Sequence, residues 1–139
     1  MNSYNRFTPT QRMKAYEWLK QQYAAGTRQK PVKCDSCSQT EGIIEPHSEN
    51  YGAPYGDHIG QYGLCYRCHM ALHTRFKNLA SFKRYAGNVL LGEVAQPFYT
   101  RDFQTFAKQH LRGYSVPVSH HTEETSSLLM DILNANTPQ

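Results

Sequence analysis

The stretch "GLCYRCHMALHTRF", residues 63–76, holds four side chains that commonly bind metal ions, all within nine positions. Cys65 and Cys68 form a CxxC pair, His69 follows directly, and His73 comes four residues later. A CxxC turn presents two thiolates to one zinc ion, and histidines four apart on a helix share a face on which they can hold a divalent ion. The stretch therefore predicts metal ligands, and the question is whether they serve one ion or two.

A second CxxC pair, Cys34 and Cys37, precedes the first, and 27 residues separate Cys37 from Cys65. Two such turns supply the four ligands of a tetrahedral structural zinc site. Two disulfides are the alternative, but they need an oxidising compartment, and the N-terminus shows no secretory signal. We therefore expect one structural zinc held by the four cysteines, which leaves His69 and His73 for a second ion.

The segment "TPTQRMKAYEWLKQQYAAG" predicts a helix that precedes the first cysteine pair. Thr8 is a suitable N-cap, Pro9 fits the first turn, and Gly26 ends the helix. Apolar side chains recur at helical spacing and predict its buried face: Met13, Tyr16, Leu19 and Tyr23.

Residues 34–68 are rich in Gly, Pro, Asn and Tyr, which predicts loops and short strands. "GIIEPHSENY" contains the best strand candidate, confined to a sheet edge or a bulge by Pro46, and a second short strand is expected before Cys65. "HMALHTRFKNLASFKRYAGNVLLG" predicts one helix, or two with a break near Asn78, ending by Gly92. Its apolar side chains lie at roughly helical spacing: Leu72, Phe76, Leu79 or Ala80, and Phe82.

The C-terminal third predicts further helix around a linker. "TRDFQTFAKQHLRG" has Thr100 as a cap and Gly113 as a stop, "YSVPVSHHTEE" is typical of a linker, and "TSSLLMDILN" is an amphipathic turn or two. The last segment carries an apolar stripe: Leu128, Leu129, Ile132 and Leu133. We expect a small α+β chain in three parts: residues 1–33, an N-terminal helix and basic linker; 34–92, a zinc-stapled core and following helix; 93–139, a C-terminal helical extension.

The formal net charge is +4, and the basic residues are clustered. Residues 1–34 carry seven Lys or Arg against one acid, and no acid lies between Asp57 and Glu93. This distribution suggests a nucleic-acid partner, and a merely solvated basic surface explains it equally well. The candidate phosphate contacts are Arg28, Lys30, Lys33, Arg67, Arg75, Lys77, Lys83 and Arg84. No run of 18 apolar residues exists, so we expect no membrane span.

The residues "CDSC…IIEPHSENYGAP…YGLCYRCHMALH" resemble the zinc-stapled HNH endonucleases of phage and restriction type, over about residues 34–76. The resemblance implies a ββα-metal nuclease core flanked by N- and C-terminal helices. It also implies metal-dependent hydrolysis of phosphodiester bonds in DNA, with Mg²⁺ or another divalent ion as catalytic cofactor. A restriction, phage or mobile-element nuclease of this kind would be cytoplasmic, in a bacterial or phage-infected cell.

Residue by residue, His69 and His73 match the helix ligands of the catalytic ion in that family. His47 matches the first histidine of the family's strand pair, and Ser48 stands where the general base should be, although serine is no base at neutral pH. If His47 is instead the base, Pro46 occupies the ligand position and contributes nothing. If His47 binds metal, another group must activate water. The candidates are then His58, a loop residue, and Tyr51, Tyr55 and Glu49.

Duplex DNA is the expected partner, and a homodimer with one active site per subunit would cut both strands of a symmetric site. Two other readings stay open. One is a non-catalytic zinc-ribbon DNA-binding or adaptor protein, which stays open because Ser48 stands at the position of the general base. The other is an RNA nuclease or RNA-binding protein, because phosphodiester chemistry is shared.

Overall fold

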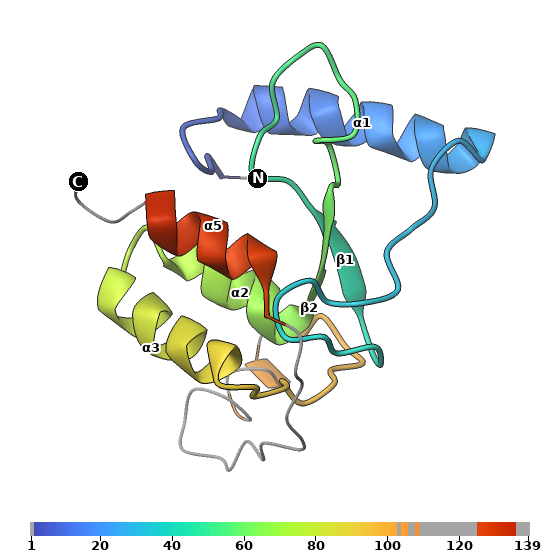
Figure 1. Ribbon diagram of the computed structural model, residues 1–139. Coiled ribbons are helices and arrows are strands. Elements are labelled where there is room, and N and C mark those ends of the chain that lie inside the picture. Colours follow the sequence, from blue (N-terminus) through green and yellow to red (C-terminus); the bar gives the residue numbers. More distant parts are fainter. Residues whose placement is uncertain (1, 103, 106–107, 109–124, 136–139) are drawn as a thin grey trace.

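The computed structural model describes residues 2–102, 104–105, 108 and 125–135. Within them the chain has a small α+β fold with four helices and one two-stranded antiparallel sheet. The helices are α1 (Pro9–Ala25), α2 (Tyr66–Thr74), α3 (Leu79–Leu90) and α5 (Ser127–Ala135), and the strands are β1 (Ile44–His47) and β2 (Tyr62–Cys65). Figure 1 shows α2, α3 and α5 together on one side of the hairpin. Helix α1 lies apart from them, across the top of the view.

Helix α1 begins and ends where the sequence predicts. The Thr8 hydroxyl accepts a hydrogen bond from the Gln11 backbone N–H, and the Gln11 side chain accepts one from the Thr8 N–H, which completes a capping box. Pro9 occupies the first turn, and Gly26 ends the helix with a φ of 77°, a conformation that glycine adopts without a steric penalty.

The predicted buried face of α1 was wrong for Met13 and Tyr16, whereas Leu19 is buried and Tyr23 is partly buried, as predicted. Met13 and Tyr16 are 48% and 41% exposed, whereas Arg12, Ala15 and Leu19 are buried. The reason is that α1 does not pack on the main core: Ala15 and Leu19 pack against Ile59, in the loop between the two strands. Contact with that loop, and not the apolarity of the helix residues alone, decides which face of α1 is buried.

The two strands pair in one register, with Ile44 opposite Cys65 and His47 opposite Tyr62. Pro46 donates no hydrogen bond, but in a two-stranded sheet each strand is an edge, so β1 accommodates it as predicted. Gly63, its partner across the hairpin, has no room for a side chain, because a Cβ there would collide with the Lys33 carbonyl and with Pro31.

Helices α2 and α3 confirm the two-helix alternative, with the break at Asn78. The Asn78 side chain accepts a hydrogen bond from the Ser81 N–H and so caps α3. Leu72 and Phe82 are buried as predicted, whereas Phe76 and Leu79 flank the break and are exposed.

The main core surrounds the four cysteines. Apolar residues of β2, α2 and α3 pack around them, and α5 adds Leu128, Leu129 and Ile132, with Leu133 partly buried against the same cluster. The helix predicted between Thr100 and Gly113 and the linker after it lie for the most part outside the described residues, so both stay predictions. None of the described helices combines the length and apolarity needed to cross a membrane.

Because α5 closes the core, a cavity in its buried face should destabilise the whole chain. We expect Leu129→Ala to lower the free energy of unfolding by about 2–5 kcal/mol, since Leu129 is fully buried. Met130→Ala, one residue along and 39% exposed, is the matched control and should change it by about 0.5 kcal/mol or less. Urea unfolding at fixed zinc concentration measures both, and equal effects would show that α5 is not part of the core.

Candidate metal centres

The structure brings the four cysteines together in one buried cluster. Their sulfur atoms all lie within 4.8 Å of one another, and the Cys37 and Cys65 sulfurs are 3.7 Å apart. A tetrahedron of Zn–S bonds of about 2.3 Å has sulfur–sulfur edges of about 3.8 Å, so the spacing suits a shared ion. All four are free thiols, and a disulfide would need sulfurs about 2 Å apart. These cysteines could hold a structural metal such as zinc.

Local structure explains how the second cysteine pair is presented. Cys65 is both the last residue of β2 and the N-cap of α2, and Cys68 lies in the first turn of that helix. Burial raises the pKa of the Cys68 thiol well above its ordinary value, and a bound cation would reverse that preference by stabilising the thiolate. A cluster of four buried sulfurs at the centre of the core is therefore best satisfied by a metal.

Three histidines form a second cluster beside the first. His47 ends β1, His69 and His73 lie on α2, and one nitrogen of each lies within 4.8 Å of the others. His47 Nδ1 and His73 Nε2 are buried and, among the described residues, have no hydrogen-bond partner. Buried polar atoms rarely stay unsatisfied, so these two lone pairs point to a ligand.

The protonation state of the cluster suits a metal. Burial, together with the neighbouring His69 and His47, lowers the pKa of His73 to about 3. Burial is also the main cause that lowers the pKa of His47. Both rings are therefore neutral at pH 7 and need release no proton to bind a cation. Three imidazoles leave positions open on a bound ion, which is the arrangement of catalytic rather than structural sites.

Behind His47 lies a buried network centred on Glu49. His47 Nε2 is 2.5 Å from Glu49 Oε2, the Tyr4 hydroxyl donates to the same oxygen, and Arg75 Nη2 donates to Oε1. Although burial by itself raises the pKa of Glu49, hydrogen bonds from His47 and Arg75 hold it at about 2. An ionised Glu49 keeps the proton of His47 on Nε2 and so leaves Nδ1 free for a metal.

The sequence reasoning missed Glu45. It precedes His47 by two residues, and side chains two apart on a strand share a face, which is the signal that could have found it. The Glu45 carboxylate lies 3.9 Å from His69 Nδ1 and 3.7 Å from the Arg101 guanidinium. The neighbouring His69 ring lowers the pKa of Glu45, so Glu45 is ionised at neutral pH.

The other candidate bases are engaged elsewhere. Ser48 is buried, and its hydroxyl accepts a hydrogen bond from the Gly60 N–H at 2.6 Å. His58 lies outside the histidine cluster and its Nε2 donates to the Gly52 carbonyl. Burial raises the pKa of Tyr51, although the nearby Arg12 opposes the shift, and Tyr55 packs against Trp18. Among the groups named from the sequence, none is a free base beside the cluster.

The predicted phosphate contacts fall into two groups. Lys30, Lys77, Lys83 and Arg84 are exposed, and Lys33 is half-buried. Three arginines instead stabilise the fold: Arg28 donates to the Ile59 carbonyl, Arg67 lies over the Tyr85 ring, and Arg75 binds Glu49. Arg75 is buried, so we withdraw it as a phosphate contact: its charge is already neutralised by Glu49.

Comparisons of this chain with protein-family models, with curated proteins and with solved structures found no match.

If the cysteine cluster holds zinc, the purified chain should contain about one tightly bound zinc. We expect Cys68→Ser to lose it and to unfold, because metal binding in small sites supplies folding energy of about 10 kcal/mol or more. Elemental analysis and circular dichroism measure the two effects. His69→Ala is the control that should keep the zinc, and a zinc-free wild type that melts equally well in EDTA would contradict a structural metal.

A substitution at Glu49 tests whether this carboxylate supports metal binding by the histidine cluster. In protein whose cysteines are already filled with zinc, we expect Glu49→Gln to weaken Co²⁺ binding by about 10–100-fold, because the His47 ring loses its ionised partner. Visible absorption of Co²⁺ during a titration measures the affinity. Glu41→Gln removes an exposed carboxylate three residues before β1 and should leave Co²⁺ binding unchanged. If Glu49→Gln and Glu41→Gln bind Co²⁺ with equal affinity, Glu49 does not support the metal site.

Proposed function

We propose that this chain is a metal-dependent endonuclease of HNH type that hydrolyses phosphodiester bonds in duplex DNA. The observation that carries the proposal is the cluster of His47, His69 and His73, formed by a hairpin strand and the helix that follows it. A strand hairpin and a helix that share a metal site are the parts that the resemblance to ββα-metal nucleases implies. The adjoining cysteine cluster supports it, because these four cysteines would hold the structural zinc that the resemblance implies.

The donor set favours a transition metal. Imidazole nitrogens suit zinc, iron or nickel, whereas Mg²⁺ prefers oxygen ligands and keeps several waters. The three histidines would hold the ion, and Glu49 and Tyr4 would hold His47 in place behind it. When bound, such an ion supplies Lewis-acid stabilisation of the charge that builds on the phosphate and the leaving oxygen.

Glu45 is our proposed general base. It is ionised, it lies next to His69, and both side chains line one cavity. Glu45 would take a proton from water while the water oxygen forms its bond to phosphorus. The bond from phosphorus to the leaving 3′ oxygen breaks, and that oxygen takes a proton from solvent. Ser48, engaged with Gly60, takes no part in this scheme.

Exposed basic residues would hold the DNA backbone. Lys77, Lys83 and Arg84 lie just before and on α3, and Lys30 lies on the approach to the first cysteine pair. Contacts of this kind bind phosphate without reading sequence, so they imply affinity that falls steeply with salt. A homodimer that cuts both strands stays a prediction.

A non-catalytic DNA-binding protein is the second candidate. The observation that favours it is the Ser48 hydroxyl, which occupies the family's base position and is committed to the Gly60 backbone. In that case the histidine cluster would be a second structural site, and cleavage would be absent with every metal.

Cleavage of supercoiled plasmid with Mg²⁺, Mn²⁺, Co²⁺ or EDTA separates the two candidates. We expect metal-dependent cutting by the wild type that is abolished in folded, zinc-loaded His69→Ala. Glu45→Gln should cut about 10²–10⁴-fold more slowly, because it removes the group that accepts the proton. Glu41→Gln, an exposed carboxylate changed in the same way, should cut like the wild type.

Well-folded wild type that shifts DNA on a gel yet cuts none in any metal would establish the binding protein instead. Cutting that survives Glu45→Gln would leave the nuclease in place and exclude Glu45 as its base. If RNA competes better than duplex DNA for the protein, the substrate is RNA and not duplex DNA.

A further inference from the structure

Arg12, on α1, is a buried cation outside the segment that resembles the nucleases. The residue is only 9% exposed, and its guanidinium carbon lies 5.4 Å from the Tyr4 ring centre and 5.2 Å from that of Tyr51. Its Nη1 donates to the Asn2 carbonyl. Its Nε is buried and has no hydrogen-bond partner among the described residues.

Arg12 differs from the other buried arginine in its charge balance. Arg75 is neutralised by Glu49, whereas Arg12 makes no ion pair with any carboxylate of the described residues. A buried charge without a counter-charge is costly, and the faces of two tyrosines offset only part of that cost. An anion bound from solution would neutralise the positive charge of Arg12.

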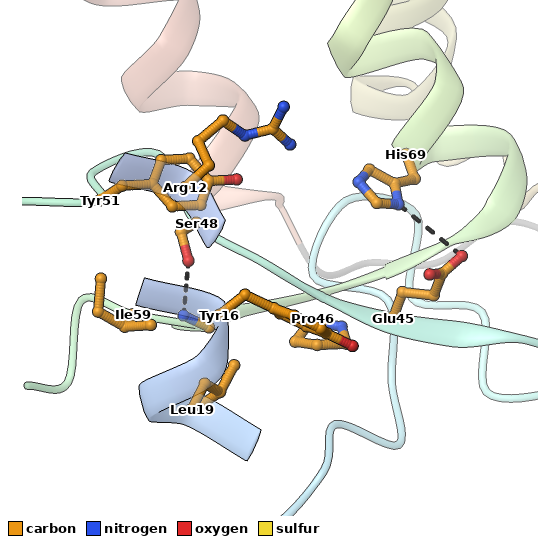
Figure 2. A pocket seen from close by; sticks show the side chains of 10 residues that line it. Arg12, Tyr16, Leu19, Glu45, Pro46, Ser48, Tyr51, Ile59 and His69 are labelled. Atoms are coloured by element: carbon orange, nitrogen blue, oxygen red, sulfur yellow. Dashed lines mark hydrogen bonds and ion pairs between the residues drawn. The ribbon is translucent and has the colours of Figure 1, made fainter. Parts of the chain in front are cut away.

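A cavity leads from Arg12 to the histidine cluster. It has a volume of about 190 Å³ and is lined by Arg12, Tyr16 and Ser48 together with Glu45 and His69. Figure 2 shows the Arg12 side chain extending from α1 toward the side on which His69 lies, and Glu45 beside His69. Cavities for whole drug-sized ligands measure about 300–1,000 Å³, so this one suits a single phosphate group better than a nucleoside.

We propose that Arg12 binds a phosphate group in this cavity. A guanidinium offers N–H donors in a planar fork that matches two oxygens of a phosphate, and charge-assisted bonds of this kind are about twice as strong as neutral ones. Glu45 is the one acid among the described residues that line the cavity, and its charge opposes an anion there. The phosphate therefore binds at the Arg12 end.

This inference rests on the proposed function for the identity of the phosphate, which would be the one that is cut. Arg12 would then neutralise charge on its non-bridging oxygens. Helix α1 would thus supply a catalytic residue to a site whose proposed metal ligands and general base all come from the hairpin and α2. The phosphate site itself can be tested without any nuclease activity.

The first experiment follows the Arg12 Nε–H signal by ¹H–¹⁵N NMR in the full zinc-loaded chain during titration with inorganic phosphate at constant ionic strength. Because an anion at the guanidinium changes the surroundings of that N–H, we expect a saturable shift with phosphate that chloride does not produce. Arg12→Gln should abolish phosphate binding, whereas Lys14→Gln, an exposed residue on the same helix, should not. Glu45→Gln should tighten binding, since it removes the opposing charge.

An Arg12 signal that stays fixed at phosphate concentrations that shift other residues would overturn the inference. This measurement uses the wild type, so it holds even if Arg12→Gln fails to fold. Arg12→Lys, which keeps the positive charge but loses the fork, should fold and bind phosphate more weakly than the wild type.

The second experiment compares DNA cleavage. Removing one preorganised donor to a transition-state oxygen costs about 10²–10³ in rate, so we expect that loss for Arg12→Gln and less than about threefold for Lys14→Gln. Phosphate binding at Arg12 without cleavage by the wild type would keep the site and reject the nuclease. Cleavage that is equal in Arg12→Gln and Lys14→Gln would keep the nuclease and reject the role of Arg12.

Discussion

The packing of four cysteines at the junction of β2 and α2 is the constraint on which the rest of the structure depends. Cys65 ends the strand and caps the helix, so no loop separates the two elements. The hairpin register places Ile44 opposite Cys65, which fixes His47 three residues further along β1. A slip of one residue would turn His47 to the other face of the hairpin and separate it from His69.

The second constraint is electrostatic and involves two glutamates close together in sequence. Glu49 is bound by Arg75, Tyr4 and His47, so it holds the fold and orients a ring but is not free for chemistry. Glu45 makes longer contacts and lines the cavity. Burial and hydrogen bonding thus assign different roles to two carboxylates that the sequence alone does not distinguish.

The N-terminal segment completes the site from outside the hairpin and α2. Tyr4 is buried, and its ring centre lies 5.3 Å from that of His47 and 4.4 Å from that of His73. The Arg12 guanidinium lies against both the Tyr4 and Tyr51 rings. Residues near position 4 and residues 47–75 therefore share one buried polar network. A fragment limited to residues 34–92 would lack Tyr4 and would leave that network incomplete.

The sequence by itself determined the features that depend on short spacing. The caps of α1, the break at Asn78, the two short strands and each CxxC turn follow from residues within a few positions of one another. Tertiary structure decided the rest. Which face of α1 is buried, why Arg75 is not free to bind phosphate, and how Glu45 and Arg12 come to line one cavity depend on contacts between distant segments. Helical periodicity ranks side chains by apolarity, but distant contacts decide burial: Ile59 covers Ala15 and Leu19. Tyr4 and Tyr51 flank the buried Arg12, while Tyr16 stays 41% exposed.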